Sequence, residues 1–315
     1  MYGLNELKHT NYKDNKTVDC PVKGCTIKVE RQTKPFKKEL KYRCPVHRIY
    51  ISPTTFEYET EKENLLWNDS KDMELFCHIK KVKKESRIAR DNSEDALTWN
   101  VFRFLDKHEL LPGFLSYISG KDIKEAELIL WSYSPQNKAS WPHLNEARHV
   151  FEKSRGSEPD ILIKTDKVLF LIEAKFNSSN KTPNELTSRN NYETADNKLF
   201  SKIFRSNIET VVVKENRYEL MRFWLLGSWI AKQLNIDFEL YSLVKKSSEK
   251  NIEKEFGKHI IESSERKFFR LTWEEIYGFV ENLEDSEYKQ KLIAYFKNKT
   301  SGYNGKGIIK KAFDV

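Results

Sequence analysis

The sequence contains no hydrophobic run long enough to cross a membrane, since its longest run, residues 223–231, already includes glycine and serine. Its first residues, MYGLNELKHTNYKD, include no hydrophobic signal region, so we expect a cytoplasmic protein without membrane association. Only four of the 315 residues are cysteines, which in that compartment suit metal ligands or buried thiols better than disulfides. No internal repeat is present. These absences indicate a globular chain of one large or two smaller domains.

Positive charge is abundant and unevenly distributed. The formal net charge is +8, and residues 20–50 alone hold six Lys and three Arg against two Glu, a local excess of +7. A second cluster, KKVKKESRIAR at residues 80–90, adds +5. Clustered basic residues favour a polyanionic partner, nucleic acid before membrane. The alternative is a solvated, lysine-rich surface with no specific partner.

Three cysteines and one histidine form a spaced motif within the basic N-terminal region. Cys20 and Cys25 enclose four residues, eighteen residues follow, and Cys44 and His47 enclose two. Three thiolates and an imidazole match the ligand set of a tetrahedral zinc site, and prolines or glycine bend each pair into a tight turn. The alternative is a set of buried thiols with His47 on the surface. We expect the fourth cysteine, Cys77, to lie in the core.

The zinc motif resembles a zinc ribbon, because the segment between its two halves alternates enough for short strands. Its first turn is longer than the usual two-residue spacing. We therefore predict a zinc-ribbon-like, basic, DNA-binding module over residues 1–90, with Zn²⁺ as its cofactor.

The most informative segment is SEPDILIKTDKVLFLIEAKF, residues 157–176. Two apolar runs, 161–163 and 168–172, flank a polar turn, which predicts a buried β-hairpin. Asp160 lies where the first strand starts, and Glu173 and Lys175 where the second ends. Side chains alternate along a strand, so Glu173 and Lys175 share a face, and an even turn places Asp160 on that face, diagonal to Glu173. This pattern suits a hard divalent cation beside a basic group.

This arrangement resembles the PD-(D/E)XK, or restriction-endonuclease-like, nuclease superfamily. Pro159-Asp160 matches the first half of its motif, and Glu173-Ala174-Lys175 matches the second, with twelve residues between Asp160 and Glu173. The resemblance implies an α/β fold with a central mixed β-sheet flanked by helices. It also implies Mg²⁺ held by Asp160, Glu173 and the Ala174 carbonyl, with Lys175 acting on the attacking water. The alternative is an edge hairpin whose ends happen to be charged.

Glu94 is a further candidate for the same metal. Residues from Asn92 onward show helical spacing of apolar side chains, with Ser93 as the N-cap and Glu94 on the apolar stripe. The resemblance implies that the helix before the hairpin supplies another acidic residue, which Glu94 matches. The alternative is a first-turn acid that complements the helix dipole.

Further elements are expected on both sides of the hairpin. A polar segment without apolar periodicity, residues 176–197, predicts a long loop. The last residues, 306–315, look like a frayed basic tail. The remaining expected elements are a strand at 126–133, helices at 199–213 and 218–234, strands at 238–244 and 267–271, and a helix opening at Thr272.

These patterns together predict a nuclease domain over residues 91–315, fused to the zinc module. The resemblance implies Mg²⁺-dependent hydrolysis of double-stranded DNA by a bacterial type II restriction endonuclease. Expected partners are a second copy of the chain, forming a homodimer, and a cognate methyltransferase acting on the same DNA site. The alternatives are a repair or defence nuclease of the same superfamily, a non-catalytic zinc-containing DNA-binding protein, and a zinc-stabilised protein-interaction module.

Overall fold

A computed structural model describes residues 1–33, 36–83, 85–152, 156, 158–184 and 189–315. The chain divides into two compact units, and the second is inserted into the first along the sequence. The first unit comprises Met1–Met73, Ser86–Phe104 and Glu274–Val315, and the second comprises Glu74–Glu85 and Leu105–Trp273. The division at residue 90, between a zinc module and a nuclease domain, is a division by function and stays a prediction.

A seven-stranded mixed sheet forms the centre of the second unit, in the order β11-β10-β9-β8-β5-β6-β7. Strands β9, β10 and β11 are parallel, whereas β9, β8, β5, β6 and β7 pair antiparallel. The strands are β5 Glu127–Leu130, β6 Tyr133–Ser134, β7 Ala139–Ser140, β8 Ile161–Lys164, β9 Val168–Ala174, β10 Asp237–Val244 and β11 Arg266–Thr272. The predicted α/β class with a helix-flanked mixed sheet is confirmed at this level.

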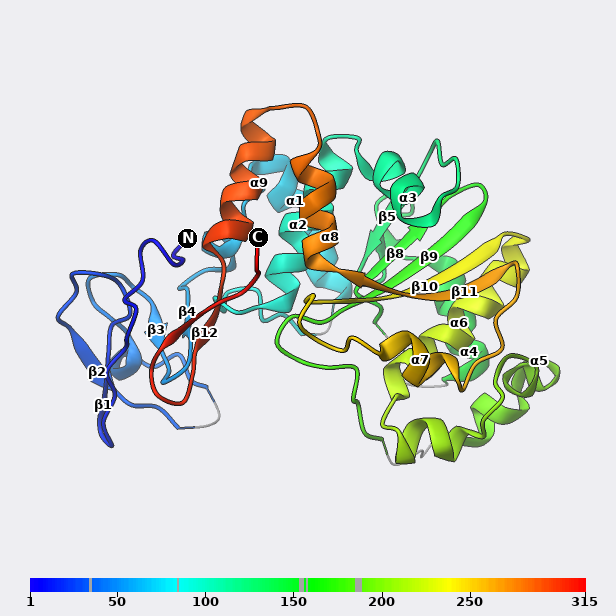
Figure 1. Cartoon of the computed structure of the whole chain (residues 1–315), viewed down its shortest axis with the longest axis horizontal. Helices are drawn as coiled ribbons and strands as arrows, with labels where there is room; N and C mark the ends of the chain where they lie inside the picture. The colour runs from blue at the N-terminus through cyan, green and yellow to red at the C-terminus, as the bar shows by residue number, and fades with distance from the viewer. Residues whose placement is uncertain (34–35, 84, 153–155, 157, 185–188) are drawn as a thin grey trace. The chain divides into compact units, whose positions relative to one another are not determined.

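Helices α4, α5 and α6 cover one face of this sheet (Figure 1). Their apolar side chains pack with Leu162, Leu169, Leu171, Phe238 and Leu240, which point to that face from β8, β9 and β10. Helix α6 is buried on nearly all sides, because its central residues, LMRFWLLGSWIA, include only one charge. The helical elements of this unit are α3 Leu111–Ser119, α4 Pro142–Phe151, α5 Arg189–Ile203, the π-helix η3 Thr210–Lys214, α6 Tyr218–Leu234 and α7 Ile252–Gly257.

The first unit combines short strands with helices and holds the chain's N-terminal hairpins. Strands β1 and β2 pair antiparallel, as do β3 and β4, and β12 and β13. Its strands are β1 Thr17–Asp19, β2 Lys28–Glu30, β3 Tyr50–Ile51, β4 Phe56–Glu57, β12 Thr300–Tyr303 and β13 Ile309–Lys311. The remaining helices of the chain are η1 Leu40–Tyr42, η2 Glu61–Asn64, α1 Ser70–Val82, α2 Glu94–Lys107, α8 Trp273–Glu281 and α9 Glu287–Asn298.

The expectation of a frayed C-terminal tail is wrong. The amide of Ile309 in β13 donates to the His9 carbonyl (2.9 Å), and Phe313 is 1% exposed. Gly307 has φ +77°, and a Cβ there would collide with the Asn11 carbonyl oxygen, so only glycine permits this close approach. The tail is held by the burial of Ala312 and Phe313 and by the backbone bonds of β13, although lysines surround these residues in the sequence.

Three other local expectations are corrected. The polar segment 176–197 is not a loop throughout, because α5 begins at Arg189, and the predicted helix 199–213 is interrupted between α5 and η3. Cys77 is exposed on α1 and does not lie in the core. Among the described residues, no helix is long and apolar enough to cross a membrane.

Candidate functional site

The β8–β9 hairpin brings the predicted acidic residues to one end of the sheet. Ile161 lies opposite Ile172 in the ladder, so continuing the register by one residue places Asp160 directly opposite Glu173, not diagonal to it. Opposite residues of an antiparallel pair share a face, and Lys175 follows Glu173 at a spacing of two. All three side chains therefore belong to the face that α6 covers.

Lys175 lies between two carboxylates. Its Nζ is 2.5 Å from Glu173 Oε1 and 3.0 Å from Glu219 Oε2. Asp160 Oδ2 accepts the amide of Ala174 at 3.0 Å, so the aspartate is bound to the end of β9. Glu219 belongs to the first turn of α6 and was missed at the sequence level. The signal that could have found it is an acidic residue at the start of a helix that is otherwise almost wholly apolar.

Glu173 is a buried carboxylate without full compensation of its charge. The residue is 3% exposed, and its Oε2 has no hydrogen-bond partner within the part of the chain that is described. Burial raises the pKa of Glu173 well above its ordinary value, and the negative charges of Asp160 and Glu219 raise it further against the opposing effect of Lys175. Among the described residues, Lys175 does not fully offset the burial of this carboxylate, and a bound cation would supply further positive charge.

Backbone bonds fix the end of β9 on both sides. The amide of Lys175 donates to the Leu243 carbonyl (2.7 Å), which extends the parallel ladder with β10 beyond Ala174. The Lys175 carbonyl accepts the indole N–H of Trp273 at 3.1 Å. The backbone that carries Glu173 and Lys175 is thus held rigidly, as a preorganised site requires.

A buried polar network fixes the loop that follows Lys175. Asn180 is fully buried, and its Nδ2 donates to Ser242 Oγ (2.9 Å) and Glu249 Oε2 (2.5 Å). Ser242 pairs with Glu173 in the β9–β10 register, so this amide lies next to the carboxylate site. Glu249 also accepts a hydrogen bond from Nη1 of Arg217 (3.0 Å), the residue immediately before α6. The network therefore links the loop after β9 to the helix that carries Glu219.

Glu94 starts α2, as its helical spacing predicts. The Ser93 hydroxyl accepts the amide of Ala96 (3.1 Å), which confirms Ser93 as the N-cap. Glu94 belongs to the first unit and the hairpin to the second. Its proposed share in the metal site stays a prediction.

The predicted zinc ligands come together in the first unit. Cys20 Sγ and Cys44 Sγ lie 3.5 and 3.6 Å from His47 Nδ1, and Cys25 Sγ lies 3.9 Å from Cys44 Sγ. Tetrahedral zinc with ordinary bond lengths gives edges of about 3.6 Å for S···N and about 3.8 Å for S···S. The four ligand atoms all lie within 4.8 Å of one another, and among the described residues no other set of three or more His, Cys, Asp or Glu does so. This group could hold a metal ion such as zinc.

Local backbone geometry explains why these four residues meet. Cys20 follows β1 and Cys25 precedes β2, so the first pair encloses the turn of that hairpin, where Gly24 has φ +75°. Cys44 and His47 enclose a tight turn before β3, in which the Arg48 amide donates to the Cys44 carbonyl (2.8 Å). Burial raises the pKa of the Cys20 thiol, so its thiolate needs a nearby cation.

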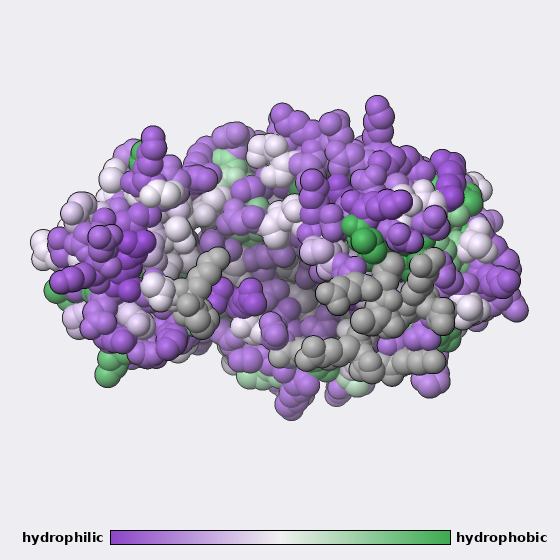
Figure 2. Space-filling view, turned by 90° about the horizontal axis from the view of Figure 1, so that it is seen from below, coloured by the Kyte–Doolittle hydropathy of each residue, from purple (hydrophilic) through white to green (hydrophobic). Residues whose placement is uncertain are grey.

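Many basic residues of segment 20–50 form ion pairs. Lys38 Nζ lies 2.9 Å from Glu57, and Arg43 Nη2 lies 2.9 Å from Glu59, two glutamates outside that segment. Further pairs among the described residues are Lys28–Asp19, Lys37–Glu39, Lys41–Glu39, Lys41–Glu30 and Arg48–Glu59. The surface is therefore less positive than the sequence count of the segment suggests. Hydrophilic residues predominate on the face seen in Figure 2.

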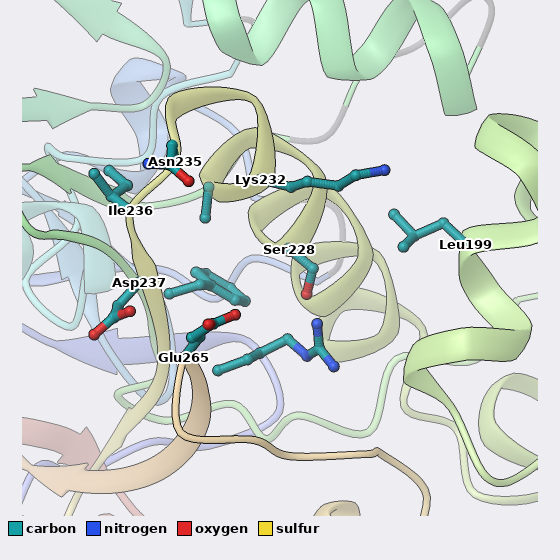
Figure 3. A pocket seen from close by; sticks show the side chains of 10 residues that line it. Leu199, Ser228, Lys232, Asn235, Ile236, Asp237 and Glu265 are labelled. Atoms are coloured by element: carbon teal, nitrogen blue, oxygen red, sulfur yellow. The ribbon is translucent and has the colours of Figure 1, made fainter.

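A separate pocket of about 350 Å³ lies at the opposite end of β10. Its wall includes Asp237 and Glu265 on one side and Leu199 of α5 on the other (Figure 3). Asp237 starts β10 and Ser242 pairs with Glu173, so about five residues of strand, or roughly 16 Å, separate the pocket from the carboxylate site. The pocket is not part of that site.

No family model, no curated protein and no solved structure matches this chain. Its function therefore has to be argued from the two residue groups described above.

Proposed function

We propose that this chain is a metal-dependent DNA endonuclease of the PD-(D/E)XK kind, acting on double-stranded DNA as a type II restriction enzyme. The observation that supports this most is Glu173, a buried carboxylate with an unpartnered oxygen, opposite Asp160 and beside Lys175. A structural hairpin gains nothing from such a group, because an uncompensated buried charge is destabilising.

Asp160, Glu173 and the Ala174 carbonyl would hold Mg²⁺. All are oxygen donors, which hard divalent cations prefer, and the unpartnered Oε2 of Glu173 fits this role. When bound, Mg²⁺ polarises a phosphate oxygen and lowers the pKa of its water. As an ammonium, Lys175 would orient the attacking water and stabilise the developing negative charge; as a neutral amine, it would accept the proton of that water.

The Cys20, Cys25, Cys44 and His47 group would hold Zn²⁺ in a structural role, because four protein ligands leave no open position for substrate. Fixed in this way, the N-terminal hairpins present Lys and Arg side chains to the phosphate backbone of DNA. Cutting both strands needs two active sites, which a homodimer supplies. A methyltransferase with the same site specificity would protect the host DNA.

Digestion of unmethylated phage DNA with Mg²⁺ tests this function. We expect discrete fragments from the wild type, and no cleavage after chelation or with Asp160→Ala, Glu173→Ala or Lys175→Ala. Lys175→Ala should still bind the metal, since an ammonium is not a metal ligand, and all three variants should bind DNA through basic surface elsewhere. Glu215→Gln is a matched control, because Glu215 pairs with a different lysine, Lys258, at a distance of 2.8 Å.

Each alternative predicts a different result in the same assay. A smear of products indicates a repair or defence nuclease that reads structure or modification. DNA binding without cleavage indicates a non-catalytic zinc-containing DNA-binding protein. Full cleavage by Glu173→Ala contradicts the proposed site.

A further inference from the structure

Glu219 contacts the candidate site from an element that the PD-(D/E)XK motif does not include. Its Oε2 forms an ion pair with Lys175 Nζ at 3.0 Å, without hydrogen-bond geometry, and its side chain is 32% exposed, whereas those of Glu173 and Lys175 are 5% and 9% exposed. Lys175 therefore has one buried and one more accessible carboxylate partner. Glu219 is the partner that remains if Glu173 takes up a cation.

The position of Glu219 is fixed by the protein on both sides. Its amide donates to Thr182 Oγ1 (3.1 Å), in the loop that follows β9. Arg217, two residues earlier, is 3% exposed and forms ion pairs with Glu249 (3.0 Å) and Glu255 (2.6 Å). Two anchors within three residues hold the first turn of α6 beside Lys175, so Glu219 is not a freely moving surface side chain.

The charges of the site identify the role of this residue. When ionised, Asp160, Glu173 and Glu219 carry three negative charges against the single positive charge of Lys175, so a divalent cation neutralises the set. A cation on Glu173 must compete there with the Lys175 ammonium, whose Nζ is 2.5 Å from Oε1. The competition weakens if another carboxylate holds the ammonium.

We propose that Glu219 is the positioning residue for Lys175: it holds the ammonium so that the Glu173 carboxylate is free for a divalent cation. This inference rests on the proposed function, because it concerns the same cation site. Glu219 acts through Lys175 and is not itself a ligand of the metal.

Manganese binding, followed by the loss of the free-ion electron paramagnetic resonance signal, tests this without any cleavage assay. The proteins are the full-length wild type, Glu219→Gln, Lys175→Met and the double variant. We expect Glu219→Gln to weaken Mn²⁺ binding about tenfold, which is mid-range for members of one ion-pair network. Lys175→Met should tighten binding, because the competing ammonium is gone.

The double variant distinguishes positioning from direct ligation. If Glu219 acts through Lys175, its replacement in the Lys175→Met background should change Mn²⁺ affinity less than about threefold. A full tenfold loss in that background makes Glu219 a direct ligand and overturns the proposal. An unchanged affinity of the single Glu219→Gln variant also overturns it.

Controls separate this inference from the proposed function. Glu215→Gln removes a lysine-paired glutamate elsewhere in the second unit, so its Mn²⁺ affinity should equal that of the wild type. Thermal unfolding of each variant shows whether the fold is retained. Absence of Mn²⁺ binding by the wild type contradicts the proposed function itself, whereas wild-type binding with an unaffected Glu219→Gln variant contradicts only the role of Glu219.

Discussion

Glu173→Gln should stabilise the metal-free protein, although it removes one member of a buried ion pair. Glutamine has nearly the shape of glutamate and carries no charge, so the unpartnered, buried Oε2 of a carboxylate is replaced by a neutral amide. Removing one partner of a buried pair usually leaves an orphaned charge, at a cost of roughly 3–5 kcal/mol. Lys175 is not orphaned here, because Glu219 lies 3.0 Å from its Nζ.

The size of the effect follows from these contacts. Removing an uncompensated buried group raises the free energy of unfolding by about 1–3 kcal/mol. Weakening the charge-assisted hydrogen bond to Lys175 lowers it by about 1 kcal/mol. The net gain is therefore about 0–2 kcal/mol, and its mid-range value of about 1 kcal/mol raises the Tm of the second unit, with its roughly 180 residues, by about 2–4 °C. Differential scanning calorimetry in chelator measures this shift.

The gain should depend on pH in a defined direction. Burial, and then Asp160, raise the pKa of Glu173 in the folded chain, so the folded state keeps a proton that the unfolded state has released. Wild-type stability therefore falls as pH rises from about 4.3, the ordinary glutamate value, through the raised pKa of Glu173. The advantage of Glu173→Gln should be small near pH 4 and should reach its full size above the raised pKa.

Added Mg²⁺ should reverse the ranking, because only the wild type binds it and gains about 2.7 kcal/mol at a hundredfold excess over Kd. A variant that melts below the wild type at every pH, with equal response to Mg²⁺, would refute this reasoning. Such a result would make Glu173 a structural residue of the hairpin.

Purified protein should contain about one zinc per chain by elemental analysis, and Cys44→Ser should lower this content and the Tm of the first unit, whereas Cys77→Ser, an exposed cysteine, should change neither. Absence of zinc from freshly purified protein would end this claim. Replacing Lys37, Lys38 and Lys41 with glutamine should weaken DNA binding and flatten its salt dependence, because fewer counterions are released. If the triple variant binds DNA with wild-type affinity and with the wild-type dependence on salt concentration, the zinc module does not face DNA.

Local patterns predicted the elements around the hairpin well. Helix 218–234 matches α6 at both ends, and strands 238–244 and 267–271 match β10 and β11 to within one residue at each end. The helix and the first of these strands are mostly apolar and are bounded by polar residues, so hydrophobic burial decides their structure with little competition. The meeting of the three cysteines and the histidine was predicted because the two residues of each pair are close in sequence and a tight turn brings them together in space.

Long-range contacts could not be predicted in the same way. Glu219 reaches Lys175 across forty-four residues, and nothing near Glu219 in the sequence signals that proximity. The exact opposition of Asp160 and Glu173 depends on the turn register, which the apolar runs leave open by one residue or two. The ordered C-terminal strand β13 was missed because lysines flank the few apolar residues of this short, mixed segment, in which Phe313 is buried.

The return of the C-terminal strand to the N-terminal hairpins sets an order of events during translation. The second unit ends at Trp273, so all its residues are synthesised, and leave the ribosome, ahead of the last segment of the first unit. The cysteine turns emerge first of all, yet β13, whose Ile309 bonds to the backbone of His9, emerges last. A nascent chain can therefore complete the sheet that carries Asp160 and Glu173 while its N-terminal module still waits for its final strand. A stop codon near residue 300 should consequently damage the part of the protein that was synthesised earliest and leave the second unit intact.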